Sequence, residues 1–133
     1  MSLADTQPGL KLRILWLLIG YSLVSLVVFL SLTSSPVDTG LNFPYEDKLY
    51  HALAYFALMF WFGQIYHDAF KRNFIAVALV IMGLLMEYLQ SFDPARMAEF
   101  ADMLANTSGV LIALLLSMTG AKNILLRLEA FIR

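Results

Sequence analysis

The 133-residue chain contains no cysteine and few charged residues. The absence of cysteine excludes disulfides, thiolate metal sites and cysteine nucleophiles, although it does not identify a compartment. Charged residues make up only 14% of the chain and hydrophobic residues 60%, whereas a soluble domain carries roughly 25% charged residues. A soluble domain of this length could not cover so much apolar surface from water. The composition therefore predicts an integral membrane protein that forms one domain over residues 1–133.

The chain also lacks an excess of positive charge. Nine Lys and Arg residues stand against ten Asp and Glu residues, which leaves a formal net charge of −1. This balance gives no basic field that would attract nucleic acid. The sequence shows no glycine loop that could cradle a phosphate, and we predict no cofactor and no nucleic-acid partner.

Four long apolar runs dominate what the sequence does contain. The first, 14–32, has no charged residue and would cover about 28 Å as a helix, close to the thickness of the bilayer core. It is longer than a signal peptide's apolar run and lacks a clear cleavage site, so we expect a retained helix. Helices are expected because hydrocarbon cannot satisfy free backbone groups. The predicted fold is an all-α bundle of four transmembrane helices, at 14–32, 49–66, 74–90 and 101–118.

Positive charges predict the orientation of these spans. The flanks on one side hold seven cations, Lys11, Arg13, Lys71, Arg72, Lys122, Arg127 and Arg133, and the other side holds only Lys48 and Arg96. The positive-inside rule then places both termini in the cytoplasm of a multi-pass protein in a bacterial inner membrane. The loops 33–47 and 91–100 would face outward.

The tail, 121–133, has a different pattern. One helical face carries Ile124, Leu125, Leu128, Phe131 and Ile132, whereas Lys122, Asn123, Arg127, Glu129 and Arg133 fall mainly on other faces. The pattern predicts a short amphipathic helix at the interface of the inner leaflet. Simple anchoring of the C-terminus is the role we favour for it.

Polar residues collect at the outer ends of the last three spans. Three stripes run along the helices: Asp47, His51 and Tyr55; Gly83, Glu87 and Gln90; and Asp102, Asn106, Gly109 and Ala113. A charged side chain deep in a lipid-facing span costs about 2.5–3.5 kcal/mol, so the stripes are predicted to face one another. Small residues at Gly83, Gly109 and Ala113 would let the helices approach closely.

This cluster supplies the candidate site residues. His51 and Glu87 are the acid–base candidates, supported by Asp47 and Asp102. The candidate binding residues are Lys48, Tyr55, Gln90, Arg96 and Asn106. Each also has a plain structural interpretation: Asp47 could cap its helix, Arg96 could pair with an acid, and the amides could satisfy backbone groups. His51 and the three acids form an adequate metal ligand set, but their spacing matches no metal motif, and no metal is predicted.

Three segments together resemble the VanZ-like family of small bacterial membrane proteins. They are "DKLYHALAYFAL", "GLLMEYLQSFDPAR" and "DMLANTSGVLIA", within about 45–116. They match a pattern of D-K-x-x-H-x-x-x-Y, then E-x-x-Q with a nearby Arg, then D-x-x-x-N-x-x-G. Ala113 departs from it, because many members carry glycine there. The resemblance implies a role at the cell envelope, since the founding member is associated with low-level teicoplanin resistance. It implies no particular reaction.

The sequence leaves three functions open. The first is an outward-facing site that binds or modifies an envelope molecule, such as a lipid-linked or glycopeptide-related one. The second is a non-enzymatic scaffold or partner-binding protein in which the same residues form a structural ion-pair network. The third is a small transporter, which the inner half of the bundle disfavours because it offers no matching polar path. We rank the first slightly ahead, and whether any reaction is catalysed stays open.

Overall fold

The computed structural model describes residues 9–32, 46–93 and 100–132, with Asp47 described by its backbone alone. Within these ranges most of the chain is helical, and no strand is present. The elements are α1 (Arg13–Leu32), α2 (Glu46–Ile65), α3 (Ala69–Gln90), α4 (Phe100–Leu116), the 3₁₀ helix η2 (Gly120–Asn123) and α5 (Ile124–Ile132). The predicted all-α class is confirmed, and the long helices fall on the four predicted apolar runs.

Two of the described helices, α1 and α3, are long and apolar enough to cross a membrane. A third span is counted if α4 and the segment Gly120–Ile132 are taken together, although the chain bends by 81° between them. α4 has 17 residues, about 26 Å of helix, and α2 begins with the charged residues Glu46, Asp47 and Lys48. Two or three of the described helices are therefore long and apolar enough to span a membrane, which is consistent with a membrane protein. The prediction of four spans is not confirmed.

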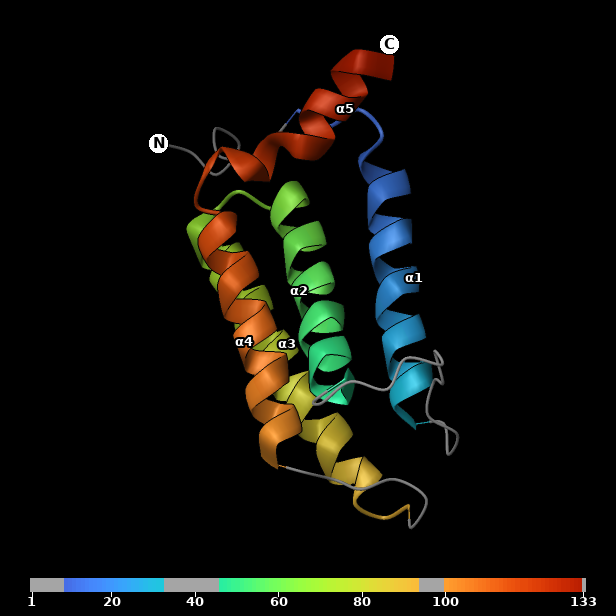
Figure 1. Cartoon of the computed structure of the whole chain (residues 1–133). Helices are drawn as coiled ribbons and strands as arrows, with labels where there is room; N and C mark the ends of the chain where they lie inside the picture. The colour runs from blue at the N-terminus through green and yellow to red at the C-terminus, as the bar shows by residue number, and fades with distance from the viewer. Residues whose placement is uncertain (1–8, 33–45, 94–99, 133) are drawn as a thin grey trace.

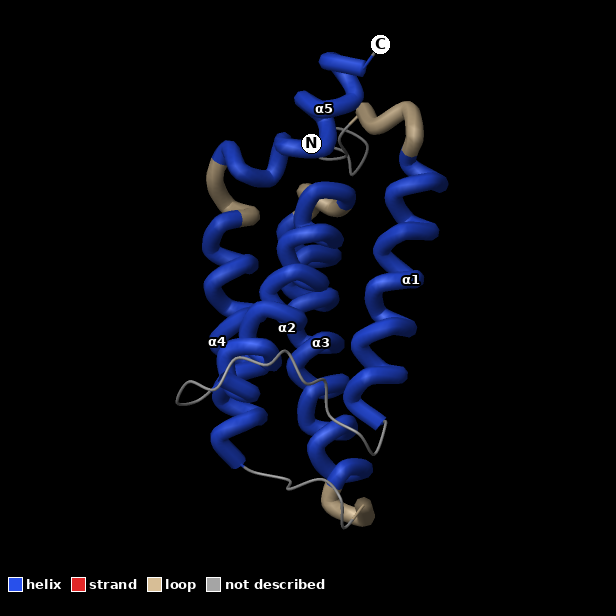
Figure 2. The backbone as a smooth tube through the Cα atoms, turned by 45° about the vertical axis from the view of Figure 1, so that its right-hand side comes forward, coloured by secondary structure: helices blue, strands red, loops and turns tan. Residues whose placement is uncertain are grey.

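The four long helices lie alongside one another, and α5 lies across the end where α1 begins (Figure 1). α1 stands at the edge of the group in both ribbon views (Figure 2). The main core joins α2, α3 and α4 through the buried residues Tyr55, Leu58, Met59, Ala76, Leu79, Val110 and Ala113. A second, smaller core joins α1, α2 and α5 through Leu10, Trp16, Ile65 and Leu125.

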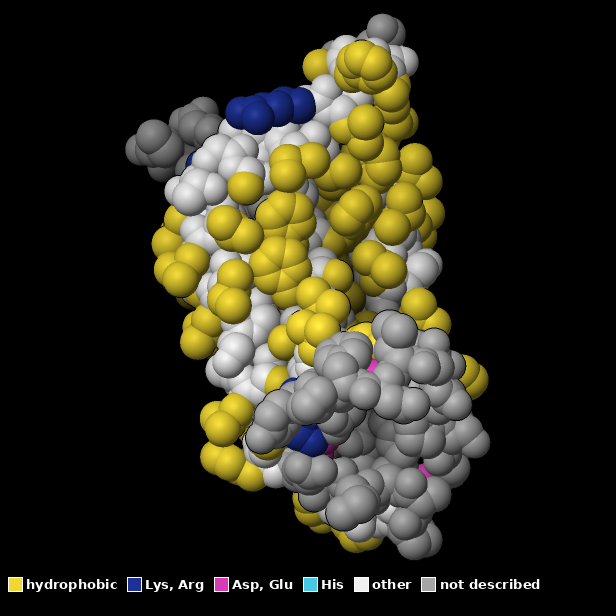
Figure 3. Space-filling view, in the orientation of Figure 1, with side chains coloured by type: hydrophobic (Ala, Val, Ile, Leu, Met, Phe, Trp, Pro, Cys, Tyr) yellow, Lys and Arg dark blue, Asp and Glu magenta, His cyan; other side chains and the backbone are white. Residues whose placement is uncertain are grey.

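Large apolar side chains cover much of the outer surface of the helices. Phe29, Ile81 and Leu115 are 68%, 57% and 63% exposed, and Figure 3 shows such side chains over the middle of the molecule, with Lys and Arg gathered near the α5 end. A soluble monomer rarely exposes so extended an apolar surface. The surface therefore suits contact with lipid, which fits the expectation of a membrane protein.

Glycine allows α2 and α4 to pack very closely. A Cβ atom added at Gly109 would lie 2.2 Å from the carbonyl oxygen of Ala52 and 3.0 Å from the amide nitrogen of Phe56. Ala113, one turn further along α4, is completely buried. Gly83 on α3 faces the same region, because its added Cβ would lie 3.1 Å from Nδ2 of Asn106. The three small residues thus stand at the points where the last three long helices meet.

Candidate functional site

Four polar side chains from α2 and α4 meet at the end of the molecule opposite α5. The Lys48 ammonium lies 3.1 Å from Oδ1 of Asp102, in ion-pair contact without an aligned hydrogen bond. His51 places Nε2 3.8 Å from Oδ2 of the same carboxylate and Nδ1 3.2 Å from Oδ1 of Asn106. Each helix contributes residues three or four positions apart, which share a helical face. We call these four residues, together with Tyr55 and Glu87, the outer polar cluster.

The cluster is buried on its α4 side and partly open on its α2 side. Asp102 and Asn106 are both 3% exposed, whereas the side chains of Lys48 and His51 are 18% and 19% exposed. The cation and the imidazole therefore form the accessible edge, and the carboxylate and amide form the floor. This arrangement could receive a polar group that approaches from the α2 side.

Tyr55 and Glu87 extend the cluster toward the interior. Tyr55 is 1% exposed and Glu87 is 6% exposed, and they are close enough to interact electrostatically. The Tyr55 hydroxyl is buried, and no described residue forms a hydrogen bond with it. Buried hydroxyls are nearly always hydrogen-bonded, so an unpaired one needs a physical explanation. Its ring lies beside Gly83, which brings α3 into the site.

Gln90 lies apart from the cluster. Its side-chain amide donates a hydrogen bond of 2.6 Å to the carbonyl oxygen of Ser31 in the last turn of α1. It thereby satisfies a carbonyl group that the end of a helix leaves without a partner. The side chain of Asp47 and the whole of Arg96 lie outside the described residues, so the roles predicted for them remain predictions.

The described charges of the cluster do not favour an anion. One ammonium, that of Lys48, stands with two carboxylates, those of Glu87 and Asp102. The formal charge is therefore −1 with His51 neutral and zero with His51 protonated. Among the described residues, no group of three His, Cys, Asp or Glu residues gathers closely enough to hold a metal ion.

A second polar cluster, which the sequence analysis missed, lies at the α5 end. Glu129 is 1% exposed, and its carboxylate accepts hydrogen bonds from the backbone amides of Lys11 and Leu12, at 2.8 Å and 2.9 Å. The indole Nε1 of Trp16 donates a third, at 2.5 Å. The carboxylate therefore binds the free amides where α1 begins, a position where negative charge is stabilised.

This contact corrects the predicted polarity of the tail. The helix itself is where the sequence predicts it, but Glu129 shares the buried face with Leu125 rather than the exposed polar one. Phe131 and Ile132 are instead 86% and 56% exposed. The tail is thus docked through Glu129 and Leu125, while Phe131 and Ile132 face outward.

The end of α2 also binds the tail. Gln64 donates from Nε2 to the carbonyl oxygen of Ala121 at 2.6 Å, and its Oε1 accepts from the amide of Leu125 at 3.1 Å. His67 places Nε2 2.9 Å from the carbonyl oxygen of Lys122, which accepts its proton. Neither Gln64 nor His67 was among the predicted site residues. A side-chain amide and an imidazole hold the junction between α4 and α5.

His67 makes this junction sensitive to pH. Burial lowers its pKa below 6.5, and the positive charges of Lys122 and Arg72 lower it further, against the opposing effect of the hydrogen bond to the Lys122 carbonyl. The folded chain therefore prefers neutral His67, and the stability that this preference contributes is present above about pH 6.5. This contribution to stability decreases as the pH falls below about 6.5. It is lost once the pH has also fallen through the lower pKa of His67 in the folded chain.

We expect the parent chain to lose more thermal stability between pH 7 and pH 5 than a His67→Gln variant. Glutamine can still donate to the Lys122 carbonyl but does not titrate. Melting curves in detergent at several pH values measure the difference. Equal pH dependence of the two melting temperatures would show that His67 does not control the junction.

Comparison of the chain with family models, with curated proteins and with solved structures gives no match in any of the three. The geometry of the outer polar cluster and the motif pattern of the sequence therefore carry the functional proposal.

Proposed function

We propose that the chain is a four-span VanZ-like protein of a bacterial inner membrane whose outer polar cluster binds the polar part of a cell-envelope molecule. Cations support this orientation, because those of the described chain gather at the α5 end and only Lys48 stands near the opposite end. The α5 end is then cytoplasmic, with α5 at the inner interface, and the cluster opens toward the outer leaflet. An amphiphile in that leaflet could enter sideways, between α2 and lipid.

The observation that carries this proposal is the buried, unpaired hydroxyl of Tyr55 behind a partly open edge. A purely structural network would be expected to satisfy its buried polar groups, because each unsatisfied group costs about 1–3 kcal/mol. Tyr55 follows His51 by one turn of α2, so a ligand that passes Lys48 and His51 into the interior would approach it. The cluster therefore has the features of a binding site, in addition to its ion pair.

The charge of the cluster defines the class of ligand group. Among the described residues, the cluster has two carboxylates and one ammonium, which suit hydroxyl, amide and ammonium groups that can donate hydrogen bonds to Asp102 and Glu87. Sugars and peptides of lipid-linked or glycopeptide-related molecules carry such groups. We therefore assign recognition to the saccharide or peptide portion of the ligand.

Binding fits the geometry better than acid–base chemistry. Both ring nitrogens of His51 are directed at protein groups, Nδ1 at Asn106 and Nε2 at Asp102. A general base needs a nitrogen within reach of the substrate proton. His51 would have to leave one of its partners to act in this way, whereas a binding role uses the arrangement as it stands.

The proposal is tested with Glu87→Gln and His51→Ala. At matched protein level, teicoplanin susceptibility is compared for cells that carry the parent chain, each variant or no chain, and thermal stability is measured in detergent. We expect the variants to lose the effect of the parent on susceptibility while their melting temperatures stay near parental. Ser108→Ala is the control, because Ser108 is exposed on α4 and bonds only to its own helix, at Leu104.

The competing function is a scaffold held together by the Lys48–Asp102 ion pair. It predicts that Glu87→Gln and His51→Ala lower the melting temperature and leave susceptibility unchanged at matched level. That result would exclude the proposed binding function. If the parent chain has no effect on teicoplanin susceptibility, a glycopeptide-related ligand is excluded from the proposed function.

A further inference from the structure

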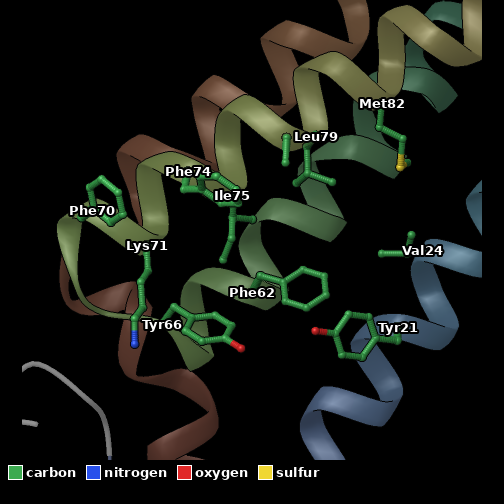
Figure 4. A pocket seen from close by; sticks show the side chains of 11 residues that line it. Tyr21, Val24, Phe62, Tyr66, Phe70, Lys71, Phe74, Ile75, Leu79 and Met82 are labelled. Carbon is green, nitrogen blue, oxygen red and sulfur yellow. The ribbon is translucent and has the colours of Figure 1, made fainter. Parts of the chain in front are cut away.

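A groove of about 530 Å³ lies between α1, the end of α2 and the first half of α3. Its volume falls within the range of roughly 300–1,000 Å³ that is typical of small-molecule sites. Most of its lining is apolar, with Phe62, Phe74, Ile75 and Leu79 from α2 and α3 facing Val24 of α1 (Figure 4). It shares no residue with the outer polar cluster.

The polar groups of the groove lie toward one end. Figure 4 shows the hydroxyls of Tyr66 and Tyr21 pointing toward each other from opposite walls, with Lys71 beyond Tyr66, whereas Val24 lies above Tyr21 and Met82 lies furthest from Lys71. The lining thus changes from cationic and hydroxylic to wholly apolar along its length. This is the pattern that an amphiphile with a charged head and a hydrocarbon tail would match.

The polar end of the groove is electrostatically positive. Lys71 is the one described cation that lines the groove, and the guanidinium of Arg13 lies 5.0 Å from the centre of the Tyr66 ring, in cation–π geometry, while it donates to the carbonyl oxygen of Ile65 at 3.3 Å. The nearby acid, Asp68, directs its carboxylate at the backbone amide of Lys71, where it caps α3 at 3.1 Å. It therefore serves the helix end, and Lys71 is the lining cation that can face an anionic group.

We propose that this groove binds one anionic phospholipid, with an acyl chain along α3 and the headgroup phosphate at Lys71. Charge complementarity identifies the occupant, because cations at the membrane surface attract anionic headgroups and the apolar length of the groove suits hydrocarbon. Tyr21 and Tyr66 donate hydrogen bonds to the phosphate or to the ester groups. The site is independent of the proposed function of the outer polar cluster.

Native mass spectrometry of the full-length chain in detergent tests this site, with phosphatidylglycerol and phosphatidylcholine as the two probes. We expect the parent to retain one phosphatidylglycerol molecule in preference to phosphatidylcholine. Lys71→Gln should reduce that preference about fivefold, the effect of one cation near an anionic headgroup. Arg127→Gln is the charge control, because Arg127 is an exposed cation at the same end that does not line the groove.

A second pair of variants tests the apolar part of the groove. Ala78→Trp would fill it, because Ala78 lines it from an exposed position on α3, and should abolish retention of both lipids. Val77→Trp, on the neighbouring exposed face of α3, should bind as the parent does. Equal retention of the two lipids by the parent, or parental binding by Ala78→Trp, would overturn the proposal. A dimer that Ala78→Trp abolishes would overturn it in favour of a second copy of the chain.

Discussion

Replacement of Gly109 by alanine is expected to separate α2 from α4 and to lower the free energy of unfolding by about 3 kcal/mol or more. The added Cβ would lie 2.2 Å from the carbonyl oxygen of Ala52, well inside van der Waals contact. That oxygen belongs to the backbone of α2, so it cannot move aside as the end of a side chain could. The whole helix would have to shift, which would open the main core around Tyr55 and Val110.

Melting curves in detergent measure this effect, and Gly120→Ala is the matched control. At Gly120 the added Cβ would meet only Nη2 of Arg127, at an ordinary 3.8 Å, so that variant should melt near the parental temperature. If Gly109→Ala melts at the same temperature as Gly120→Ala, α2 and α4 are further apart than in the structure. That result would also remove the basis for the contact between His51 and Asn106.

Replacement of Glu129 by alanine is the second large expected effect. Three donors lose their acceptor at once, the amides of Lys11 and Leu12 and the indole of Trp16. The indole of Trp16 is buried, and a buried donor left unsatisfied costs about 1–3 kcal/mol. The amides of Lys11 and Leu12 belong to exposed residues and add less, so we expect a total loss of about 3 kcal/mol. α5 should leave the start of α1, because the acid is its principal polar contact there.

Trypsin cleavage and melting curves measure the release of α5 from the start of α1. In Glu129→Ala, cleavage after Arg127 should become much faster than in the parent, and the melting temperature should fall. Ala130→Gln is the control, since Ala130 is exposed on the same helix. Glu129→Gln retains one acceptor oxygen, so its cleavage rate and melting temperature should lie between those of the parent and those of Glu129→Ala. Parental cleavage of Glu129→Ala would contradict the docking of α5 through this carboxylate.

The helices of this chain are largely predictable from sequence because a bilayer constrains length and composition together. A run such as 14–32, without a charge, has one plausible structure in hydrocarbon, and α1 (Arg13–Leu32) differs from it by a single residue. The number of helices that cross the membrane is harder to predict from the sequence than the positions of the helices. α4 falls short, and the chain turns by 81° after it, which no hydropathy pattern shows.

Part of the outer polar cluster is also predictable, because residues three or four apart on a helix share a face. Lys48 and His51 meet Asp102 and Asn106 for that reason. Gln90 follows Glu87 by three positions, yet its amide reaches back to Ser31 of α1. A helical stripe specifies a face but not which neighbouring helix that face meets.

The docking of α5 could not be predicted from the pattern of side chains. Glu129 binds backbone amides 117 and 118 positions earlier in the chain, and backbone groups have no sequence signature. One signal was present, since the first turn of α1 contains no acidic residue that could interact with its free amides. An isolated acid in a basic tail was therefore a candidate partner for them.

The central claim, that the outer polar cluster binds a ligand, is tested most directly with Tyr55→Phe. The change removes a hydroxyl that no described residue pairs with, so the melting temperature in detergent should equal or exceed the parental value. At matched protein level, the effect of the chain on teicoplanin susceptibility should nevertheless be lost, because the ligand loses its deepest hydrogen bond. A parental effect on susceptibility in Tyr55→Phe would contradict the claim and would leave the cluster as a structural network between α2, α3 and α4.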